Sequence, residues 1–271
     1  MSQPTSNFIK FLGTAGARYV VARQLRSSAG TWYNFDGVNI LVDPGPGTLV
    51  RCFSSRPPLD PATLQAIVLT HCHIDHSTDM NVLIEAMTDS GHQKGKIVIT
   101  TAEAIGREPV IFSYVRDYLG KLELMNAGAE FEIAPTIRMI TPIAHRHTAE
   151  TYGLKFQLPW GVVSHIVDTS YFEELAAAYA GSDVLIMNVV RLENKSDREK
   201  GILHLTVADA DKIIQAVQPK AAIITHFGMT MVRAKPWIVA QKLSETSGVP
   251  VIAASDGMAF DLTPYMLQLG R

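Results

Sequence analysis

The residues best suited to chemistry lie in one short segment, residues 70–76, which reads Thr-His-Cys-His-Ile-Asp-His and directly follows an apolar run. Imidazole and carboxylate groups are the ligands that Zn²⁺, Mn²⁺ and Fe²⁺ accept in hydrolytic sites. His71 and His73 are two residues apart, so on an extended backbone both side chains point the same way. Asp75 and His76 follow where the chain is expected to turn, and they can face a second point in space. The segment therefore predicts half of a site for two metal ions.

Three more candidate ligands follow at or just after the ends of predicted strands. His147 lies six residues before Gly153, Asp168 ends the stretch Val-Val-Ser-His-Ile-Val-Asp, and His226 follows Ala-Ile-Ile-Thr. Side chains from separate strand ends can converge at one place, but it is the family resemblance described next that marks these three residues as ligands.

Taken together, these motifs resemble the metallo-β-lactamase-fold hydrolases, in which His-x-His-x-Asp-His follows a buried strand and a histidine, an aspartate and a last histidine come later. Asp43, in Val-Asp-Pro-Gly-Pro-Gly, matches the early aspartate turn of that family. The resemblance covers roughly residues 8 to 262. It implies an α/β chain folded as a four-layer αββα sandwich, with two mixed sheets flanked by helices.

The resemblance also implies a ligand set for two divalent metal ions, with Zn²⁺ expected and Mn²⁺ or Fe²⁺ as alternatives. By the family's assignment, the first ion takes His71, His73 and His147, the second takes Asp75, His76 and His226, and Asp168 bridges both. A hydroxide between the ions is the expected nucleophile, because metal binding lowers the pKa of water from 15.7 to about 7. The predicted ligands do not select one of these three metals, because histidine and aspartate bind each of them.

Neighbouring residues leave some assignments open. His145 shares the predicted strand face of His147 and competes with it as the third histidine ligand, although the spacing to Gly153 favours His147. Asp43 is interpreted as a group that supports the ligands or forms the turn. Cys72 points opposite to its neighbours and is interpreted as strand packing. His165 is interpreted as an ordinary core or surface histidine.

His204 favours a phosphodiesterase over other hydrolases of this kind. The segment Gly201-Ile-Leu-His204-Leu-Thr resembles one found in tRNase Z-like enzymes and cyclic-phosphate phosphodiesterases, where the histidine approaches the scissile phosphate. Such a histidine offsets charge on phosphate oxygens or protonates the leaving oxygen. Asp75 and His204 are therefore the predicted catalytic residues. The long arm that ribonuclease Z enzymes carry before the bridging aspartate does not fit between His147 and Asp168.

Two other functions compete with a phosphodiesterase that acts on a small or nucleotide-like diester. A lactonase or thioesterase would use the same metals, but ester hydrolysis generates no phosphate dianion for His204 to neutralise. A non-catalytic metal-binding sensor would be expected to lack a ligand, and the predicted set is complete.

Composition limits the partners and the location. The net charge of −2 argues against strong general nucleic-acid binding, and we expect a small-molecule substrate. No apolar run approaches the roughly 18 residues needed to span a membrane, and the first residues do not form a secretory signal. Cys52 and Cys72, the only cysteines, form no disulfide framework, so a reducing cytoplasm is expected. The oligomeric state stays open, a homodimer included.

Short apolar runs alternate with helical patterns and predict sheets covered by helices in a single domain, residues 1–271. Residues 87–131 are the least regular and are interpreted as a cap beside the pocket. A capping box at Thr206 and Asp209 predicts a helix over 207–217. Further helices are expected over 170–180 and 237–247, and Asp256-Gly257 is interpreted as a hairpin turn. The predicted strands are 9–12, 38–42, 66–70, 96–100, 137–144, 154–158, 162–167, 184–188, 221–225 and 251–254.

Overall fold

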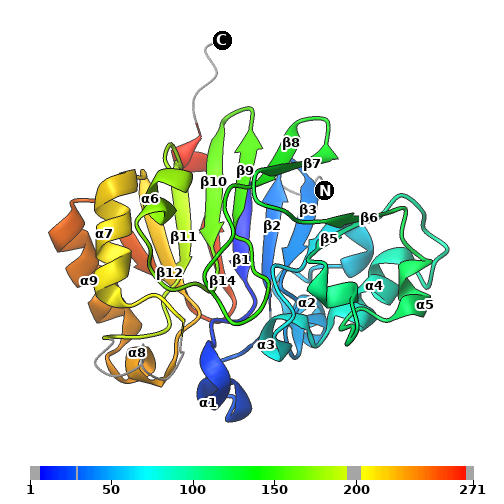
Figure 1. The fold of residues 1–271 in the computed structure, drawn as a ribbon, viewed down its shortest axis with the longest axis horizontal. Coiled ribbons are helices and arrows are strands. Elements are labelled where there is room, and N and C mark those ends of the chain that lie inside the picture. Colours follow the sequence, from blue (N-terminus) through cyan, green and yellow to red (C-terminus); the bar gives the residue numbers. More distant parts are fainter. Residues whose placement is uncertain (1–6, 29, 194–202, 267–271) are drawn as a thin grey trace. The chain divides into compact units, whose positions relative to one another are not determined.

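The computed structural model describes residues 7–28, 30–193 and 203–266. Of these residues, one compact unit, unit 1, takes 7–13, 27–125 and 256–266, and a second, unit 2, takes 14–26 and 126–255. Each unit contains one mixed β-sheet with helices against it (Figure 1). Among the described residues, no helix is long and apolar enough to cross a membrane.

The sheet of unit 1 has seven strands within the described residues, in the order β14-β1-β2-β3-β4-β5-β6. Pairs from β14 to β3 are antiparallel, and pairs from β3 to β6 are parallel. The strands are β1 (Phe8–Phe11), β2 (Thr31–Phe35), β3 (Val38–Val42), β4 (Leu64–Val68), β5 (Ile97–Thr100), β6 (Lys121–Leu124) and β14 (Met258–Asp261).

Helices of unit 1 cover one face of this sheet. Its α-helices are α2 (Thr48–Ser54), α3 (Ile74–Ser77), α4 (Met80–Thr88) and α5 (Ser113–Arg116), with short 3₁₀ helices at Pro61–Thr63, Glu103–Ile105 and Thr263–Tyr265. The core between them joins sheet residues such as Trp32, Ile67 and Val98 to Cys52 of α2 and Leu83 of α4, all fully buried. Burial of this apolar face is the main force that holds the helices on the sheet.

The sheet of unit 2 also has seven strands within the described residues, in the order β13-β12-β11-β10-β9-β8-β7. It repeats the arrangement of unit 1, because its first three pairings, from β7 to β10, are antiparallel and the next three, from β10 to β13, are parallel. The strands are β7 (Ala129–Ala134), β8 (Ile137–Thr141), β9 (Leu154–Leu158), β10 (Gly161–Ile166), β11 (Val184–Asn188), β12 (Ala221–Thr225) and β13 (Val251–Ala253).

The α-helices of unit 2 are α1 (Ala17–Ala22), α6 (Glu174–Ala178), α7 (Val207–Val217), α8 (Met229–Arg233) and α9 (Pro236–Ser247). Residues of α6, α7, α8 and α9 pack against the parallel half of the sheet, and α1 contacts α8. Figure 1 shows α7 and α9 side by side, and both contribute to one apolar core with β10, β11 and β12. The predicted capping box is confirmed, since the Thr206 hydroxyl accepts from the Asp209 amide while the Asp209 carboxylate accepts from the Thr206 amide.

The predicted fold class is confirmed, because the chain forms two mixed sheets flanked by helices. All ten predicted strands are present, with ends that differ by a few residues. Residues 66–70 are shifted to Leu64–Val68, because the Thr70 amide donates to the Asp43 carboxylate and not to a neighbouring strand. Apolar runs did not predict β2, β6, β7 and β14, which mix polar with apolar residues.

Two other expectations change. The interpretation of Asp256-Gly257 as a hairpin turn is wrong, because β13 and β14 belong to different sheets. Residues 87–131 supply β5 and β6 to the sheet of unit 1, and a cap formed by the rest of this segment stays a prediction. The single-domain interpretation also stays a prediction.

Parallel strands place their carboxyl ends at one edge of a sheet, which explains how each unit gathers polar residues. In unit 1, the loops after β3 and β4 begin at this edge. In unit 2, the loops after β10, β11 and β12 do so, and the loop before the antiparallel β9 reaches the same edge. The candidate ligands lie in these loops or, for Asp75 and His76, in α3, which follows the loop after β4.

Candidate metal centre

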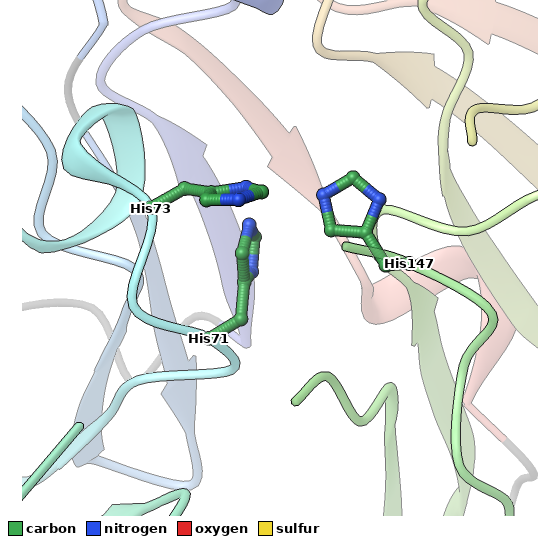
Figure 2. Close-up of side chains that lie close together, drawn as sticks. All are labelled: His71, His73 and His147. Atoms are coloured by element: carbon green, nitrogen blue, oxygen red, sulfur yellow. The ribbon is translucent and has the colours of Figure 1, made fainter. Parts of the chain in front are cut away.

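The cluster of unit 1 comes from the loop that joins β4 to α3, which holds His71 and His73, and from α3 itself, which holds Asp75 and His76. Residues 69–73 leave the sheet, and α3 begins at Ile74 after His73. The rings of His71 and His73 lie edge to face, with centroids 4.8 Å apart (Figure 2). The ring of His76 lies 4.1 Å from that of His71, and its Nε2 is 3.9 Å from the Asp75 carboxylate. The structure therefore brings the four predicted ligands of this segment together.

Asp43, at the end of β3, holds this loop through three hydrogen bonds. One carboxylate oxygen accepts from the Thr70 amide at 2.7 Å, and the other accepts from the Thr70 hydroxyl at 2.7 Å and from His76 Nδ1 at 2.9 Å. The Thr70 hydroxyl, having donated to Asp43, accepts from His71 Nδ1 at 3.1 Å. One buried carboxylate therefore fixes the backbone of the loop and two of its rings.

These hydrogen bonds also decide which nitrogen each ring presents. A carboxylate accepts only, so the hydrogen of His76 lies on Nδ1 and the lone pair lies on Nε2. The Thr70 hydroxyl donates its only hydrogen to Asp43, so His71 Nδ1 must carry a hydrogen. The lone pair of His71 therefore lies on Nε2. Metal-binding histidines are oriented in this way by carboxylates behind them. Asp43, His71 and His76 hold donor atoms within 4.8 Å of one another, but the three hydrogen bonds of Asp43 assign it to support.

A glycine allows the close packing that this arrangement needs. A Cβ on Gly45 would lie 2.0 Å from the Asp75 carbonyl oxygen and 2.3 Å from that of Ser28. Asp43 itself has φ of 52°, a left-handed conformation that few non-glycine residues adopt. The turn Asp43-Pro-Gly45 therefore stores strain where it supports the ligand loop.

In unit 2, three histidines surround the carboxylate of Asp168, which follows β10. His226 Nε2 is 3.5 Å from one of its oxygens, and His147 Nε2 and His204 Nδ1 are 3.8 and 3.6 Å from the other. Two donor atoms on one tetrahedral zinc, each roughly 2.0–2.2 Å from it, lie about 3.4 Å apart. The spacings from Asp168 to His226 and to His147 therefore suit nitrogen and oxygen atoms that share an ion.

The two competing histidines have different partners. His147 Nδ1 donates to the Leu203 carbonyl at 2.9 Å, which leaves Nε2 toward Asp168. His145 instead has Nε2 bonded to the Tyr179 hydroxyl at 2.8 Å in a fully buried environment. Burial lowers the pKa of His145 to about 3, against the opposing effect of Asp168, so this ring is neutral at pH 7. The geometry favours His147 as the ligand.

His226 follows β12 with φ of 59°, the same unusual conformation as Asp43. The segment Thr14-Ala15-Gly16 runs beside it, where the Gly16 amide donates to the Phe227 carbonyl and the Phe227 amide donates to the Thr14 carbonyl. A Cβ on Gly16 would lie 2.2 Å from the His226 carbonyl oxygen. The segment Thr14-Ala15-Gly16 is thus a backbone support for His226.

His204 lies just before α7, and its side chain is close to Asp168. Its ring centroid is 5.1 Å from that of His147, and Nδ1 faces Asp168. Because the two nitrogens of an imidazole point to opposite sides, Nε2 is directed away from Asp168. Gly201 and Ile202 of the predicted motif lie outside the described residues.

Sequence reasoning missed the polar residues behind Asp168. The Asn188 amide donates to the Asp168 carboxylate at 2.9 Å, and His165 Nε2 lies 3.1 Å from the Asn188 side-chain oxygen. Asn188 ends an otherwise apolar strand, which was the one signal that could have identified it. Cys72 packs partly against the core of unit 1, but it lies in the loop after β4 and not in a strand as predicted.

The residues of both clusters suit divalent cations. Each cluster offers imidazole nitrogens and carboxylate oxygens, and backbone or side-chain partners hold the opposite ring nitrogen of His71, His76 and His147. This combination of ligand and supporting hydrogen bond is typical of metal sites.

Comparisons with known proteins agree with this chemistry. A family model described as a beta-lactamase superfamily domain matches residues 38–227. An uncharacterized protein of Methanocaldococcus jannaschii, MJ1374, is 29% identical over 262 residues, which are 94% of each chain. The metallo-beta-lactamase fold protein YhfI of Bacillus subtilis has a TM-score of 0.77 at 16% identity, covering 94% of this chain and 99% of its own. A diphosphatase of the PhnP family has a TM-score of 0.67 at 17% identity, covering 93% and 96%.

Proposed function

Because the chain belongs to the beta-lactamase superfamily, whose fold is that of metal-dependent hydrolases, we propose that it hydrolyses a small or nucleotide-like phosphodiester. The observation that carries this proposal is His204, which lies beside Asp168 with Nδ1 toward the carboxylate at 3.6 Å. The fold is also shared with a diphosphatase, which favours chemistry at phosphorus.

We propose the ligand order of the family for this chain. His71, His73 and His147 take one divalent ion, Asp75, His76 and His226 take the other, and Asp168 bridges both. Zn²⁺ is the metal that we expect first. The support within unit 1 is the anchoring of His71 and His76 through Asp43, and the support within unit 2 is the convergence of His147 and His226 on Asp168. When bound, the ions would activate water and offset negative charge on the substrate.

Other residues of the chain would then orient the ligands or act on the substrate. Asp43 and the Leu203 carbonyl hold the rings of His76 and His147 in one tautomer. The Nε2 lone pair of each ring is therefore available to a metal before the substrate binds. His204, with Nε2 directed away from Asp168, would offset charge on a phosphate oxygen or protonate the leaving oxygen. We also propose a cytoplasmic location, supported by two cysteines that form no disulfide.

The test is a comparison of substrate classes in wild type and His204→Ala, with Zn²⁺ and with Mn²⁺. The variant should keep its metal content, while kcat on a chromogenic phosphodiester falls by roughly 10²-fold or more, as expected for losing an acid or charge stabiliser. Lactone and thioester substrates should be affected much less. His92→Ala is the matched control, since His92 is exposed and lies outside both clusters.

Two outcomes would contradict the proposal. Equal losses on phosphodiester and ester substrates would remove the argument for phosphate and favour a lactonase or thioesterase. Loss of metal from His204→Ala would move this residue into the ligand set, and the catalytic role would then have to be abandoned.

A further inference from the structure

A chain of buried polar groups lies behind Asp168 in unit 2. The side chains of His165, Asn188 and Asp168 follow one another at 3.1 and 2.9 Å, and all three residues are at most 4% exposed. His165 belongs to β10 and Asn188 ends the neighbouring parallel strand β11. Neither residue belongs to the ligand set proposed above.

The direction of these hydrogen bonds follows from the chemistry of the groups. The carboxylate of Asp168 accepts only, so Asn188 turns its NH₂ toward it. The carbonyl oxygen of the Asn188 amide then faces His165, so the hydrogen of His165 lies on Nε2. Each group thereby fixes the orientation of the next, and the amide of Asn188 has only one satisfactory orientation.

This chain fixes the carboxylate that three histidines face. Asn188 donates to the same oxygen that faces His226, and the other oxygen is therefore directed to His147 and His204. Rotation of the carboxylate would break the bond from Asn188 and leave a buried amide without its acceptor, which costs about 1–3 kcal/mol.

The polarity of Asn188 is unusual for its place. The rest of β11, Val184–Met187, is entirely apolar and buried, and Asn188 is the polar residue that ends it. An apolar side chain would pack there without any need for a partner. The polar side chain is instead joined on one side to Asp168 and on the other to His165.

We propose that Asn188 is a positioning residue for Asp168, and that His165 acts through Asn188 by fixing the orientation of its amide. This inference rests on the proposed function, because it takes Asp168 as the bridging ligand. It adds that the carboxylate is oriented before any metal binds, by a side chain that touches neither the ions nor the substrate.

The test measures metal affinity by chelator competition, together with thermal unfolding of the metal-free protein. Asn188→Leu keeps the size of the side chain but removes the donor, and it should weaken metal binding by about 10- to 100-fold, the usual effect of losing a partner of a ligand. His165→Leu should have a smaller effect in the same direction. His165→Gln, which still offers an N–H, should recover part of it.

Non-additivity distinguishes this role from a general loss of packing. If His165 acts through Asn188, the double variant Asn188→Leu/His165→Leu should bind metal no more weakly than Asn188→Leu alone. The matched control is Ser164→Ala on the same strand, since Ser164 is buried and bonds to Ser182 but does not contact Asp168. Its metal affinity should be unchanged.

The outcomes separate this inference from the proposed function. If Asn188→Leu and His165→Leu bind metal within about 2-fold of wild type while Asp168→Ala loses it, the positioning role is wrong and the ligand set stands. If Asp168→Ala also binds metal normally, the ligand set itself is wrong. Should Asn188→Leu fail to fold, the pair His165→Leu and His165→Gln decides the question, since equal affinities in both would contradict the role.

Discussion

The two clusters use the same kinds of side chain but assemble them in different ways. In unit 1, four candidate ligands come from one segment of six residues, and a single carboxylate, Asp43, supports that segment. In unit 2, the histidines around Asp168 come from separate segments before β9, before α7 and after β12, and Asp168, His147 and His226 each have a support of their own. Unit 1 thus concentrates its support in one residue, and unit 2 distributes it.

This difference affects how each cluster should fail. Loss of a shared support should release several ligands together, whereas loss of a local support should release one. In both clusters, a residue with a left-handed backbone conformation lies near a glycine that packs closely against a backbone carbonyl oxygen. These pairs are Asp43 with Gly45 in unit 1 and His226 with Gly16 in unit 2. Backbone strain is therefore present in both clusters, and the surrounding contacts stabilise the strained residues.

The largest effect is expected from Asp168→Ala. Because the carboxylate would serve both ions, turnover should fall by more than the roughly 100-fold that loss of a supporting hydrogen bond costs. Metal binding should weaken at both positions. Activity assays and metal analysis check this, with Asp211→Ala, an aspartate of α7 outside both clusters, as the control. Activity that survives within a few-fold would show that Asp168 does not bridge.

Asp43→Ala should have the next largest effect and would sharpen the comparison most. It removes the acceptor of Thr70 and His76 together, so affinity at the unit 1 ligands should fall by about 10- to 100-fold. This loss of metal affinity should exceed that caused by Asn188→Leu, because Asn188→Leu leaves the supports of His147 and His226 in place. Chelator competition measures both, and Asp60→Ala, an aspartate that caps a short 3₁₀ helix in unit 1, is the control. Equal losses would contradict the contrast between shared and distributed support.

A smaller effect, on stability, is expected from Gly16→Ala and Gly45→Ala. Each new methyl group would lie within about 2.2 Å of a backbone carbonyl oxygen that cannot move without displacing His226 or Asp75. Overpacking of this kind usually costs about 1–3 kcal/mol. Denaturant unfolding of the metal-free protein measures it. In Gly106→Ala, the control, the nearest atom would be 3.3 Å away, so a much smaller loss is expected.

The smallest effect concerns the two thiols of unit 1. Burial, with the charge of Asp79, raises the pKa of the Cys52 thiol to about 12, so at pH 8 it stays protonated and unreactive. Cys72 is only partly buried and lies between two candidate ligands. Alkylation at pH 8 should therefore modify Cys72 and spare Cys52, and added metal should slow it. Mass spectrometry identifies the labelled residue, and rapid labelling of Cys52 would contradict the packing of this core.

The sequence predicted the unit 1 ligands because they are local. Residues 70–76 contain the ligands in one run, and a strand followed by a turn is enough to bring them together. The unit 2 residues were found only through a resemblance to known hydrolases, since spacing alone does not bring residues 147, 168 and 226 to one sheet edge. The choice between His145 and His147 depends on Tyr179 and Leu203, which are distant in sequence.

The supporting residues were the least predictable. Asn188 and His165 are ordinary residues in a sequence, and their importance appears only when β10 and β11 pair and place them beside Asp168. Patterns along the chain do not contain this information. The missed strands are a different case, because β2 and β7 mix polar with apolar residues and so lack the apolar runs from which the other strands were predicted.

We propose that the seven ligands of the two clusters hold two ions. The most direct measurement is the metal content of the metal-free protein after reconstitution with increasing Zn²⁺. A plateau near two equivalents per chain is expected, because seven ligands are too many for one tetrahedral ion. A clear plateau at one equivalent, in protein with every predicted ligand intact, would contradict it.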